Sequence, residues 1–430
     1  MAEVRPFRGV RYNTRSAGDL SMLLCPPFDV ISKQERERLY ADSEFNVIRL
    51  ESGVDEPGDI PGNDRYTRAA KLQAEWLESG VLRKDDSPSF YVIQETFSFA
   101  GKDYIRQGLI SEVRLEEFNK GIVLPHEFTR PGPKADRLAL MRSTKANYSP
   151  IMALYRDSGS NIAKVMKRAM SFDAIAEARP EGLPSLRLWS ITDPTDIETV
   201  TSVLSDTQIY LADGHHRYET AITYRDEVRT TNDLGASGSI DFRLMTLISV
   251  DDPGLLLLGY HRQLHDASGD ELTRFRDYVT GEFDLEDKGP VDPLSAADFE
   301  QALNAAPPDE VAIGFAGVEP GRLQIGLMRN PVDAKDELAA SDYTRLHDEV
   351  IRSAFNIERE QTVVAFEHDA FSVLQAVSQG MAQVGFVMRA VPIEPFETIV
   401  KQGQRLPSKS TYFHPKLHTG AVIQRLEDEL

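Results

Sequence analysis

The sequence is poor in several features, and each scarcity excludes a class of protein. Its 430 residues include one cysteine, Cys25, which excludes an internal disulfide and a multi-cysteine zinc site and fits a reducing cytoplasm. No run of about 18 apolar residues occurs, and the first residues, MAEVRPFRGVRYN, lack the apolar segment of a secretion signal. We therefore expect a cytoplasmic protein that does not insert into a membrane.

Positive charge is scarce as well. The chain has 48 lysine and arginine residues against 68 aspartate and glutamate residues, which gives a formal net charge of −20. Non-specific binding to nucleic acid needs a basic face, so we expect no nucleic-acid partner. A local basic pocket is still compatible with this composition.

Several common nucleotide-binding and catalytic motifs are missing. The sequence has no G-x-x-x-x-G-K-[ST] loop, no G-x-G-x-x-G fingerprint, no H-E-x-x-H and no G-x-S-x-G. A nucleotide would therefore have to be held without a Walker motif.

The hydrophobic pattern predicts an α/β or α+β fold. Apolar residues make up 41% of the chain, enough for a large core, and the length favours two or three domains or subdomains. Strand-like runs alternate with segments of helical period. The strand-like runs are 46–51, 90–97, 186–191, 208–212, 242–250 and 311–315, and the helical segments are 64–79, 136–147, 217–228 and 343–355.

Residues 90–115 have the pattern of a β-hairpin, with apolar positions alternating on both sides of Ala100-Gly101-Lys102. Part of the sheet is then antiparallel, and a mixed sheet follows. Clusters of glycine, proline and aspartate at 53–63, 180–184 and 288–293 are the best candidate breaks in the chain.

The densest group of chemically active side chains lies in LADGHHRYETA, residues 211–221. The surrounding pattern predicts a strand over 208–212, a tight turn at Asp213-Gly214 and a helix over 217–228. The amino terminus of a helix offers free N–H groups and the positive end of the helix dipole. The order strand, turn and helix therefore predicts an anion site.

Phosphate is the anion that these residue types favour. Gly214 permits a close approach of the backbone, and the guanidinium of Arg217 can hold two oxygens in a fork. His215 and His216 add further polar groups at the same turn. The alternative is that Asp213 caps the helix while the histidines and Arg217 form a surface network.

A second group lies in LPHEFTRPGPKADRLALMRSTKAN, residues 124–147. Glu127, in Pro125-His126-Glu127, follows a strand-like segment and precedes a helix that begins near Asp136. Cations near a carboxylate keep it ionised, so Glu127 suits a general base or a metal ligand, and a salt-bridged loop acid fits equally well. The nearby bases are Arg130, Lys134, Arg137 and Lys145. A solvated helix face explains the spacing of Asp136, Arg137, Arg142 and Lys145 just as well.

A third group lies in LPSKSTYFHPKLHTG, residues 406–420. Lys409, Ser410 and Thr411 place one cation and two hydroxyls in a loop bracketed by prolines. Such groups suit a carboxylate or a phosphate of a small ligand, although hydroxyl-rich loops are also common as plain turns.

In the order P-H-E, D-G-H-H-R and K-[ST]-T, these motifs resemble the free serine kinases of the ParB/sulfiredoxin superfamily. The local match is closest at Ala212-Asp213-Gly214-His215-His216-Arg217-Tyr218. All of these motifs, together with CPPFDVIS at 25–32 and NVIRLE at 46–51, also look typical of a large bacterial family of unknown function.

The resemblance implies a role for each matched residue. Glu127, in the motif with His126, would take the proton from the substrate hydroxyl. Asp213, Gly214, His215, His216 and Arg217 would bind the transferring phosphate and nearby substrate groups. Lys409, Ser410 and Thr411 would meet the carboxylate of the amino acid or the phosphates. Further candidate contacts are Lys134, Arg137 and Asp29.

The resemblance also implies an architecture and a set of ligands. We expect an amino-terminal α/β subdomain over 1–122, a ParB/sulfiredoxin-like catalytic core over 123–260, and a carboxyl-terminal α/β subdomain over 261–430 that returns the 409–411 loop to the site. Mg²⁺ would accompany a phosphoryl donor, which in relatives is ATP, ADP or pyrophosphate. A homodimer is compatible with the sequence.

Two other branches of the superfamily fit less well. Sulfiredoxins carry a reactive cysteine in Gly-Gly-Cys-His-Arg, where this chain has His215, so reduction of sulfinic acids is excluded. ParB-like clamps need a basic DNA-binding helix, which the charge of −20 disfavours. Tyr412-Phe413 also replaces the basic pair that follows Lys-[Ser/Thr]-Thr in the kinases, which leaves the donor open.

Three further residues have simpler interpretations. Asp29 and Glu51 each stand at the end of an apolar segment, where a cap or turn is the default, although both have the chemistry of a metal ligand or a supporting group. His347 falls in a predicted amphipathic helix and is expected to be a surface histidine.

The sequence therefore favours a small-molecule kinase that converts free L-serine to O-phosphoserine. One alternative is a non-catalytic regulator that binds a nucleotide or a phosphorylated metabolite at the same turn. Another is a phosphatase or phosphotransferase that acts on a different small alcohol.

Overall fold

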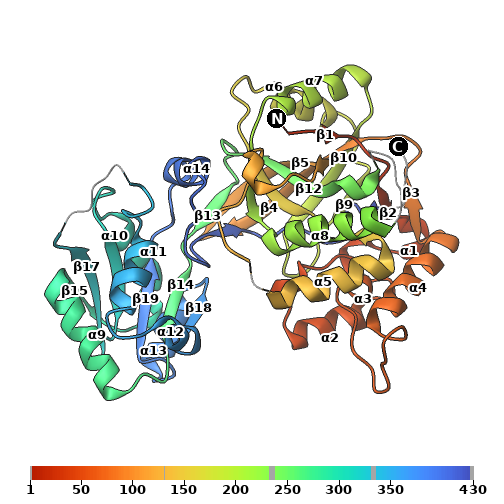
Figure 1. The fold of residues 1–430 in the computed structure, drawn as a ribbon. Helices are drawn as coiled ribbons and strands as arrows, with labels where there is room; N and C mark the ends of the chain where they lie inside the picture. Colours follow the sequence, from red (N-terminus) through yellow and green to blue (C-terminus); the bar gives the residue numbers. More distant parts are fainter. Residues whose placement is uncertain (1, 130, 232–237, 331–335, 427–430) are drawn as a thin grey trace. The chain divides into compact units, whose positions relative to one another are not determined.

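The computed structural model describes residues 2–129, 131–231, 238–330 and 336–426, and the chain folds into two compact units (Figure 1). Unit 1 consists of residues 1–125, 129–256 and 415–430. Unit 2 consists of residues 126–128 and 257–414. Residues 126–128 therefore belong to unit 2, although the residues on both sides of them belong to unit 1. At residue 415 the chain passes from unit 2 back to unit 1.

Unit 1 is built on a nine-stranded mixed sheet, as the sequence predicts. Its order is β6-β11-β8-β12-β5-β4-β10-β9, with β1 paired to β5. The pairs β6/β11 and β8/β12 are parallel, and the other neighbours are antiparallel. The strands are β1 (Val4–Arg5), β4 (Phe90–Phe99), β5 (Lys102–Arg114), β6 (Val123–Leu124), β8 (Ile151–Tyr155), β9 (Ala176–Ala178), β10 (Ser185–Ile191), β11 (Ile209–Asp213) and β12 (Phe242–Ser249).

The predicted hairpin forms between β4 and β5, with Phe99 opposite Lys102. Its two turn residues, Ala100 and Gly101, have φ of +48° and +75°. Two positive φ angles are what a type I′ turn requires, and this turn matches the twist of the strands it joins.

Helices cover both faces of this sheet. Alternate residues of a strand point to opposite faces, so Phe90 and Val92 enter one hydrophobic core while Tyr91 and Ile93 enter the other. The first core includes residues of α6 (Asn161–Ala169), α7 (Pro194–Ser205) and α8 (His215–Thr231). The second includes residues of α1 (Thr14–Ala17), α2 (Lys33–Asp42), α3 (Ile48–Glu51) and α4 (Arg65–Glu78). Helix α5 (Pro131–Thr144) gives Met141 to the first core and Leu140 to the second.

Two pairs of short strands complete unit 1. Strand β2 (Val10–Tyr12) pairs with β3 (Leu82–Lys84), and β7 (Ala146–Asn147) pairs with β21 (Gln424–Arg425). The second pair attaches the returning carboxyl-terminal segment to unit 1.

Unit 2 is built on a six-stranded sheet in which every neighbouring pair is antiparallel, in the order β15-β17-β16-β19-β14-β18. The strands are β14 (His261–Leu264), β15 (Phe283–Pro290), β16 (Ala312–Ala316), β17 (Arg322–Met328), β18 (Val364–Glu367) and β19 (Val384–Met388). A two-stranded sheet pairs β13 (Leu256–Leu258) with β20 (Tyr412–His414).

Each side of the unit 2 sheet has its own packing. Helices α10 (Ala296–Asn304) and α13 (Ala370–Ser378) share a core with Ala312, Ala316 and Val387. Phe275 of α9 (Gly269–Glu282) packs edge to face on Phe386, whose ring lies 6.1 Å from that of Phe315. The other helices are α11 (Asp342–Arg345), α12 (Ile357–Val363) and α14 (Ile393–Lys401). No helix within the described ranges is both long and apolar enough to cross a bilayer.

Several predicted elements need correction. Residues 46–51 form no strand; Ile48–Glu51 is the helix α3, because the side chain of Asn46 accepts the Ile48 N–H at 2.9 Å and starts the turn. The helix expected from Asp136 begins at Pro131, and the helix expected over 343–355 is the short α11 followed by a π-helix, Leu346–Ile351.

The predicted ranges and the two units divide the chain differently. Residues from both 1–122 and 123–260 supply strands to the nine-stranded sheet. The candidate breaks at 53–63 and 180–184 are loops inside unit 1, and 288–293 lies inside unit 2. The roles expected for the three ranges stay predictions.

The hairpin turn provides a test of this fold. Ala100 has a left-handed φ that costs an ordinary L-residue about 1 kcal/mol, whereas asparagine tolerates it well. Ala100→Asn should therefore raise the free energy of unfolding by up to about 1 kcal/mol, measured by urea denaturation. Gly101→Val at the neighbouring position should lower it; equal effects of both changes would contradict the turn.

Candidate functional site

The turn predicted at 213–214 lies in unit 1, between β11 and the start of α8, and Figure 1 labels this helix. Strand β11 ends at Asp213, Gly214 follows with φ of +96°, and α8 begins at His215, two residues earlier than predicted. His215 and Arg217 are buried, with 6% and 4% exposure, so this group is not the surface network considered as an alternative.

Asp213 joins two cations from different parts of unit 1. Its Oδ2 accepts a hydrogen bond from Arg217 Nη2 at 2.6 Å, and Lys416 Nζ contacts its Oδ1. Burial raises the pKa of Asp213, but the charges of Lys416 and Arg217 outweigh burial and hold the pKa well below its ordinary value. The carboxylate therefore stays ionised. Lys416, five residues after Thr411, was missed as a candidate.

Arg217 is fixed in place on both of its terminal nitrogens. Its Nη1 donates to the Pro150 carbonyl at 2.7 Å while Nη2 binds Asp213. Gly214 lies against this guanidinium, and a Cβ at Gly214 would be 3.0 Å from Nε and Nη2 of Arg217. The glycine is therefore needed for its positive φ and for this close approach. Direct phosphate contacts by the turn stay a prediction.

The basic residues of α5 have partners within unit 1. Lys134 Nζ binds Glu219 Oε2 of α8 at 2.8 Å, and Arg142 binds Glu227 at 2.6 Å. These two pairs hold α5 against α8. Arg130 lies outside the described residues.

Arg137 is buried, which the solvated-face interpretation of α5 does not explain. Its exposure is 7%, and its Nη1 donates to the Glu51 carbonyl at 2.9 Å and lies 3.2 Å from Glu51 Oε1. Asp136 contacts its Nε at 2.7 Å and Nη2 at 2.6 Å. Glu51, itself buried, also accepts from Ser149 Oγ at 2.9 Å.

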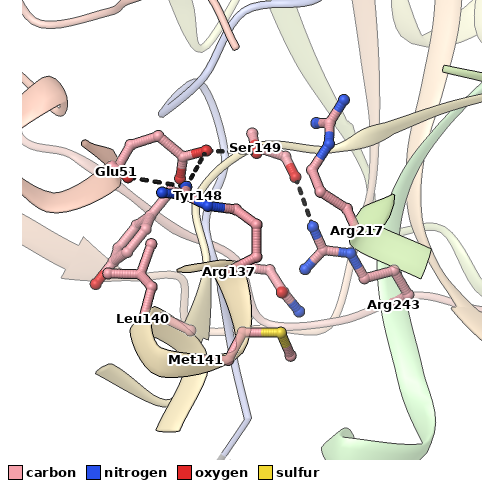
Figure 2. Close-up of a pocket in the computed structure, with 10 residues that line it drawn as sticks. Glu51, Arg137, Leu140, Met141, Tyr148, Ser149, Arg217 and Arg243 are labelled. Atoms are coloured by element: carbon pink, nitrogen blue, oxygen red, sulfur yellow. Dashed lines mark hydrogen bonds and ion pairs between the residues drawn. The ribbon is translucent and has the colours of Figure 1, made fainter. Parts of the chain in front are cut away.

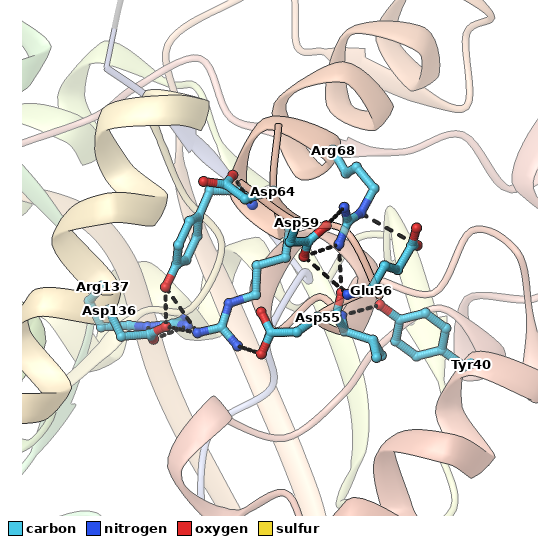
Figure 3. Close-up of polar contacts among 11 residues, drawn as sticks. Tyr40, Asp55, Glu56, Asp59, Asp64, Arg68, Asp136 and Arg137 are labelled. Carbon is cyan, nitrogen blue, oxygen red and sulfur yellow. Dashed lines mark hydrogen bonds and ion pairs between the residues drawn. The ribbon is translucent and has the colours of Figure 1, made fainter. Parts of the chain in front are cut away.

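A polar network ties Asp136 to the 53–63 loop and to α4 (Figure 3). Asp136 Oδ1 accepts from Arg65 Nη2 at 2.6 Å and from Tyr66 Oη at 2.8 Å. One turn further along α4, Arg68 binds both oxygens of Asp59 at 2.5 and 3.0 Å. The network fixes Asp136, and Asp136 in turn orients Arg137.

Three arginines line one pocket of unit 1, which Figure 2 shows. Arg137, Arg217 and Arg243 meet there with one lining carboxylate, Glu51. The empty space of the pocket is about 290 Å³ with open solvent included, and the centre of a water molecule can lie in about 20 Å³ of it. Arg243 was missed because it stands in an apolar strand; a charged residue inside FRLMTLISV was the available signal.

The Pro-His-Glu and Lys-Ser-Thr motifs meet in unit 2. The Lys409 N–H donates to Glu127 Oε1 at 3.1 Å, although the two residues are 282 positions apart. His126 Nε2 lies 2.7 Å from Thr411 Oγ1, and the Leu406 N–H donates to the His126 carbonyl at 2.9 Å. The structure thus brings together residues from two of the three predicted groups.

The side chains of this loop differ in exposure. Glu127 is 20% exposed at its side chain, whereas His126 is 1% exposed and lies edge-on to the rings of Phe396 and Phe413. Ser410 is fully buried and donates to the Pro407 carbonyl at 2.6 Å. Lys409 has φ of +61° and places its Nζ 5.2 Å from the centre of the Tyr260 ring. Ligand contacts by Lys409, Ser410 and Thr411 stay predictions.

His347 is buried, so its interpretation as a surface histidine is wrong. Its Nε2 lies 3.2 Å from Arg262 Nε, and its Nδ1 contacts Glu360. Arg262 is fully buried; burial lowers its pKa to about 10, against the charge of Glu127. The π-helix turns His347 inward, which helical periodicity does not predict.

The remaining candidates have little involvement in these groups. Asp29 is exposed in the short helical turn Phe28–Val30. Cys25 is fully buried, and burial raises the pKa of its thiol well above the ordinary value. Within 2–129, 131–231, 238–330 and 336–426, no three His, Cys, Asp or Glu side chains gather as a metal site.

These observations define an α/β protein with a large mixed sheet and two groups of candidate site residues. Residues 4–390 match the family described as "Protein of unknown function (DUF1015)", and the chain belongs to this family. This confirms the predicted family of unknown function. No curated protein matches the chain.

Three solved structures illustrate distant similarity. A conserved hypothetical protein from Pyrococcus furiosus is 13% identical, with 73% of this chain and 95% of that chain covered and a TM-score of 0.34. A free serine kinase in complex with AMP is 11% identical, with 74% and 91% covered and a TM-score of 0.34. SbnI from Staphylococcus aureus, with a C-terminal truncation, is 10% identical, with 72% and 85% covered and a TM-score of 0.35.

The charge of Asp213 should make stability depend on pH. Because its pKa is lower in the folded than in the unfolded protein, its pairing stabilises the fold above the ordinary pKa of 3.8 and is lost as pH falls below that value. Asp213→Asn should cost about 3 kcal/mol at pH 7 and give a shallower loss of stability as pH falls from about 4 to about 2, measured by urea denaturation. The exposed Asp251→Asn is the control; an equal effect of both changes would refute the pairing.

The turn itself can be tested through Gly214. Gly214→Ala adds a Cβ at a φ that L-residues rarely adopt and displaces Arg217, so it should lower the free energy of unfolding by about 2 kcal/mol or more. Gly281→Ala, in helix α9 with open space around it, should leave stability unchanged or raise it. Thermal unfolding of both variants decides; an unchanged Tm for Gly214→Ala would contradict the described turn.

Proposed function

We propose that the protein is a phosphotransferase that phosphorylates the hydroxyl of free L-serine to O-phosphoserine, with ATP, ADP or pyrophosphate as donor. The proposal rests on the three motifs and on the chemistry that their residues offer. Phosphoryl transfer needs positioning, cations near the phosphate oxygens and a base near the attacking hydroxyl. The described residues supply each of these chemical groups.

The observation that carries the proposal is the hydrogen bond from the Lys409 N–H to Glu127 Oε1. It unites two motifs that the kinase resemblance names and that lie 282 positions apart. It also orients a carboxylate that keeps 20% exposure, as a base that must reach a substrate requires. A structural role for Glu127 alone would not explain why both motifs of the kinase resemblance are present.

Each motif has its own proposed role. In unit 2, Glu127 accepts the proton of the serine hydroxyl, and the buried His126 positions the 409–411 loop through Thr411. In unit 1, Asp213 fixes Arg217 and Lys416, and the turn that follows it, with Gly214, His215 and His216, binds the transferred phosphate. The positive charges of Arg217 and Lys416 stabilise the negative charge that spreads over the phosphate oxygens during transfer.

Mg²⁺, when bound, would neutralise charge on the phosphates of the donor. Asp213 is engaged by Lys416 and Arg217, and the described residues contain no cluster of three metal-ligating side chains. These residues by themselves therefore do not form a Mg²⁺ site. Binding of the ion stays a prediction that depends on the donor.

The direct test is ³¹P NMR of the purified protein with L-serine, Mg²⁺ and, in separate samples, ATP, ADP and pyrophosphate. An O-phosphoserine resonance with one donor identifies reaction, acceptor and donor together. If the donor phosphates broaden without any product, the protein is either a regulator that binds them or a phosphotransferase that acts on a different acceptor. Free phosphate from the donor without a serine product indicates a hydrolase.

Glu127→Gln tests the base. Removal of the proton acceptor should lower kcat by about 10²-fold or more while donor binding, measured by calorimetry, is retained. Glu394→Gln, an exposed glutamate of unit 2, is the matched control and should keep full activity. Unchanged kcat in Glu127→Gln would remove Glu127 from the mechanism.

A further inference from the structure

Arg243 is a buried cation with incomplete bonding. It lies on β12 with 3% exposure, and its Nη2 donates to the Ser149 carbonyl at 3.0 Å. Its Nε and Nη1 are buried and have no hydrogen-bond partner among the described residues. A guanidinium carries five N–H donors, so these two nitrogens leave several of them unsatisfied.

The carboxylates around Arg243 already form ion pairs with other cations. Glu51, the acidic residue that lines the pocket, is bound to Arg137 and Ser149. Beyond the pocket, Asp136 holds Arg137. Asp213 is likewise taken, by Arg217 and Lys416. No carboxylate of the described residues forms an ion pair with Arg243, so the pocket has an excess of positive charge.

A second observation supports this excess. Burial lowers the pKa of Arg243 to about 9, and the charge of Arg217 acts in the same direction. An isolated buried charge is strongly unfavourable unless a counter-charge or hydrogen-bonding partner approaches it. The charge of Arg243 therefore needs a partner that the described residues do not supply.

The shape of the pocket limits that partner. Figure 2 shows the side chains of Arg137, Arg217 and Arg243 around one hollow, with Leu140 and Met141 on its apolar side. The space in which the centre of a water molecule can lie is about 20 Å³, little more than the roughly 10–15 Å³ that one water needs, so the partner is compact.

We propose that the hollow lined by Arg137, Arg217 and Arg243 binds a compact anion, which completes the bonding of Arg243. The ligand is either a free inorganic anion such as chloride or the carboxylate head of a small molecule. The hollow shares Arg217 with the phosphoryl transfer proposed above, but the anion would be bound with or without turnover. Because Arg217 also binds Asp213, a bound anion would help to fix the 213–217 turn.

Thermal unfolding tests the site without any phosphoryl donor, so a failed kinase assay leaves it intact. The protein in HEPES buffer is titrated with sodium chloride or sodium acetate, each compared with sodium HEPES at equal ionic strength. We expect the Tm to rise by about 2 °C or more and to increase with the logarithm of anion concentration. A rise with chloride identifies an inorganic anion, and a rise with acetate alone identifies a carboxylate.

Arg243→Met is the decisive variant. It removes the unpaired charge, so it should abolish the anion-dependent rise, and its Tm without added anion should equal or exceed that of the natural protein. Arg142→Met removes an exposed arginine of the same unit and should keep the full rise. The same rise in natural protein and Arg243→Met, or no rise with any anion, would overturn the site.

Crystals of the natural protein soaked in sodium bromide give an independent result if Arg243→Met does not fold. An anomalous peak within hydrogen-bonding distance of Arg243 supports the inorganic anion. Carboxylate density there in acetate-soaked crystals supports the second class. A hollow that holds only water in both soaks refutes the proposal.

Discussion

The ion pairs of Asp213 are the interaction on which the polar part of unit 1 depends. One carboxylate at the end of β11 holds Arg217 from the first turn of α8 and Lys416 from the returning carboxyl-terminal segment. Arg217 in turn reaches the Pro150 carbonyl and lines the arginine pocket. The geometry of the turn and of the pocket therefore rests on a single ionised acid. A strand end, a helix start and a distant segment can meet there because the carboxylate offers two oxygens to two cations.

Local patterns were sufficient for the elements with strong periodicity. The β4–β5 hairpin, the mixed sheet and the strand-turn-helix order at 209–231 follow from alternation and turn chemistry. The pattern failed at 46–51, where Asn46 starts a buried helical turn in a segment whose alternation suggests a strand. It also gave no sign of the return to unit 1 after residue 414, because contacts such as that of Gln424 with Asn147 join residues 277 positions apart.

The candidate site was predictable where polar residues are dense. His126 and Glu127 contact the 409–411 loop, as the motifs of the resemblance predict. Arg217 is bound to Asp213 at the predicted turn. Lys416 and Arg243 were missed because the importance of each comes from partners that are remote in sequence or are backbone carbonyls. Residue type reveals a cluster, but the pairing of single buried charges depends on the assembled fold.

The return of residues 415–426 to unit 1 has a consequence for the order in which the protein is made. The buried carboxylate of Glu95 binds Arg106 early in the chain but receives His418 Nδ1, at 2.9 Å, only from this last segment. In the same way, Asp213 lacks its contact with Lys416, and β7 lacks its partner strand β21, until residues 415–426 are made. During synthesis on the ribosome, unit 1 must therefore remain incomplete while the whole of unit 2 is translated. Its native contacts form in full only after residues 415–426 are made, because these residues bind side chains and strands made several hundred positions earlier.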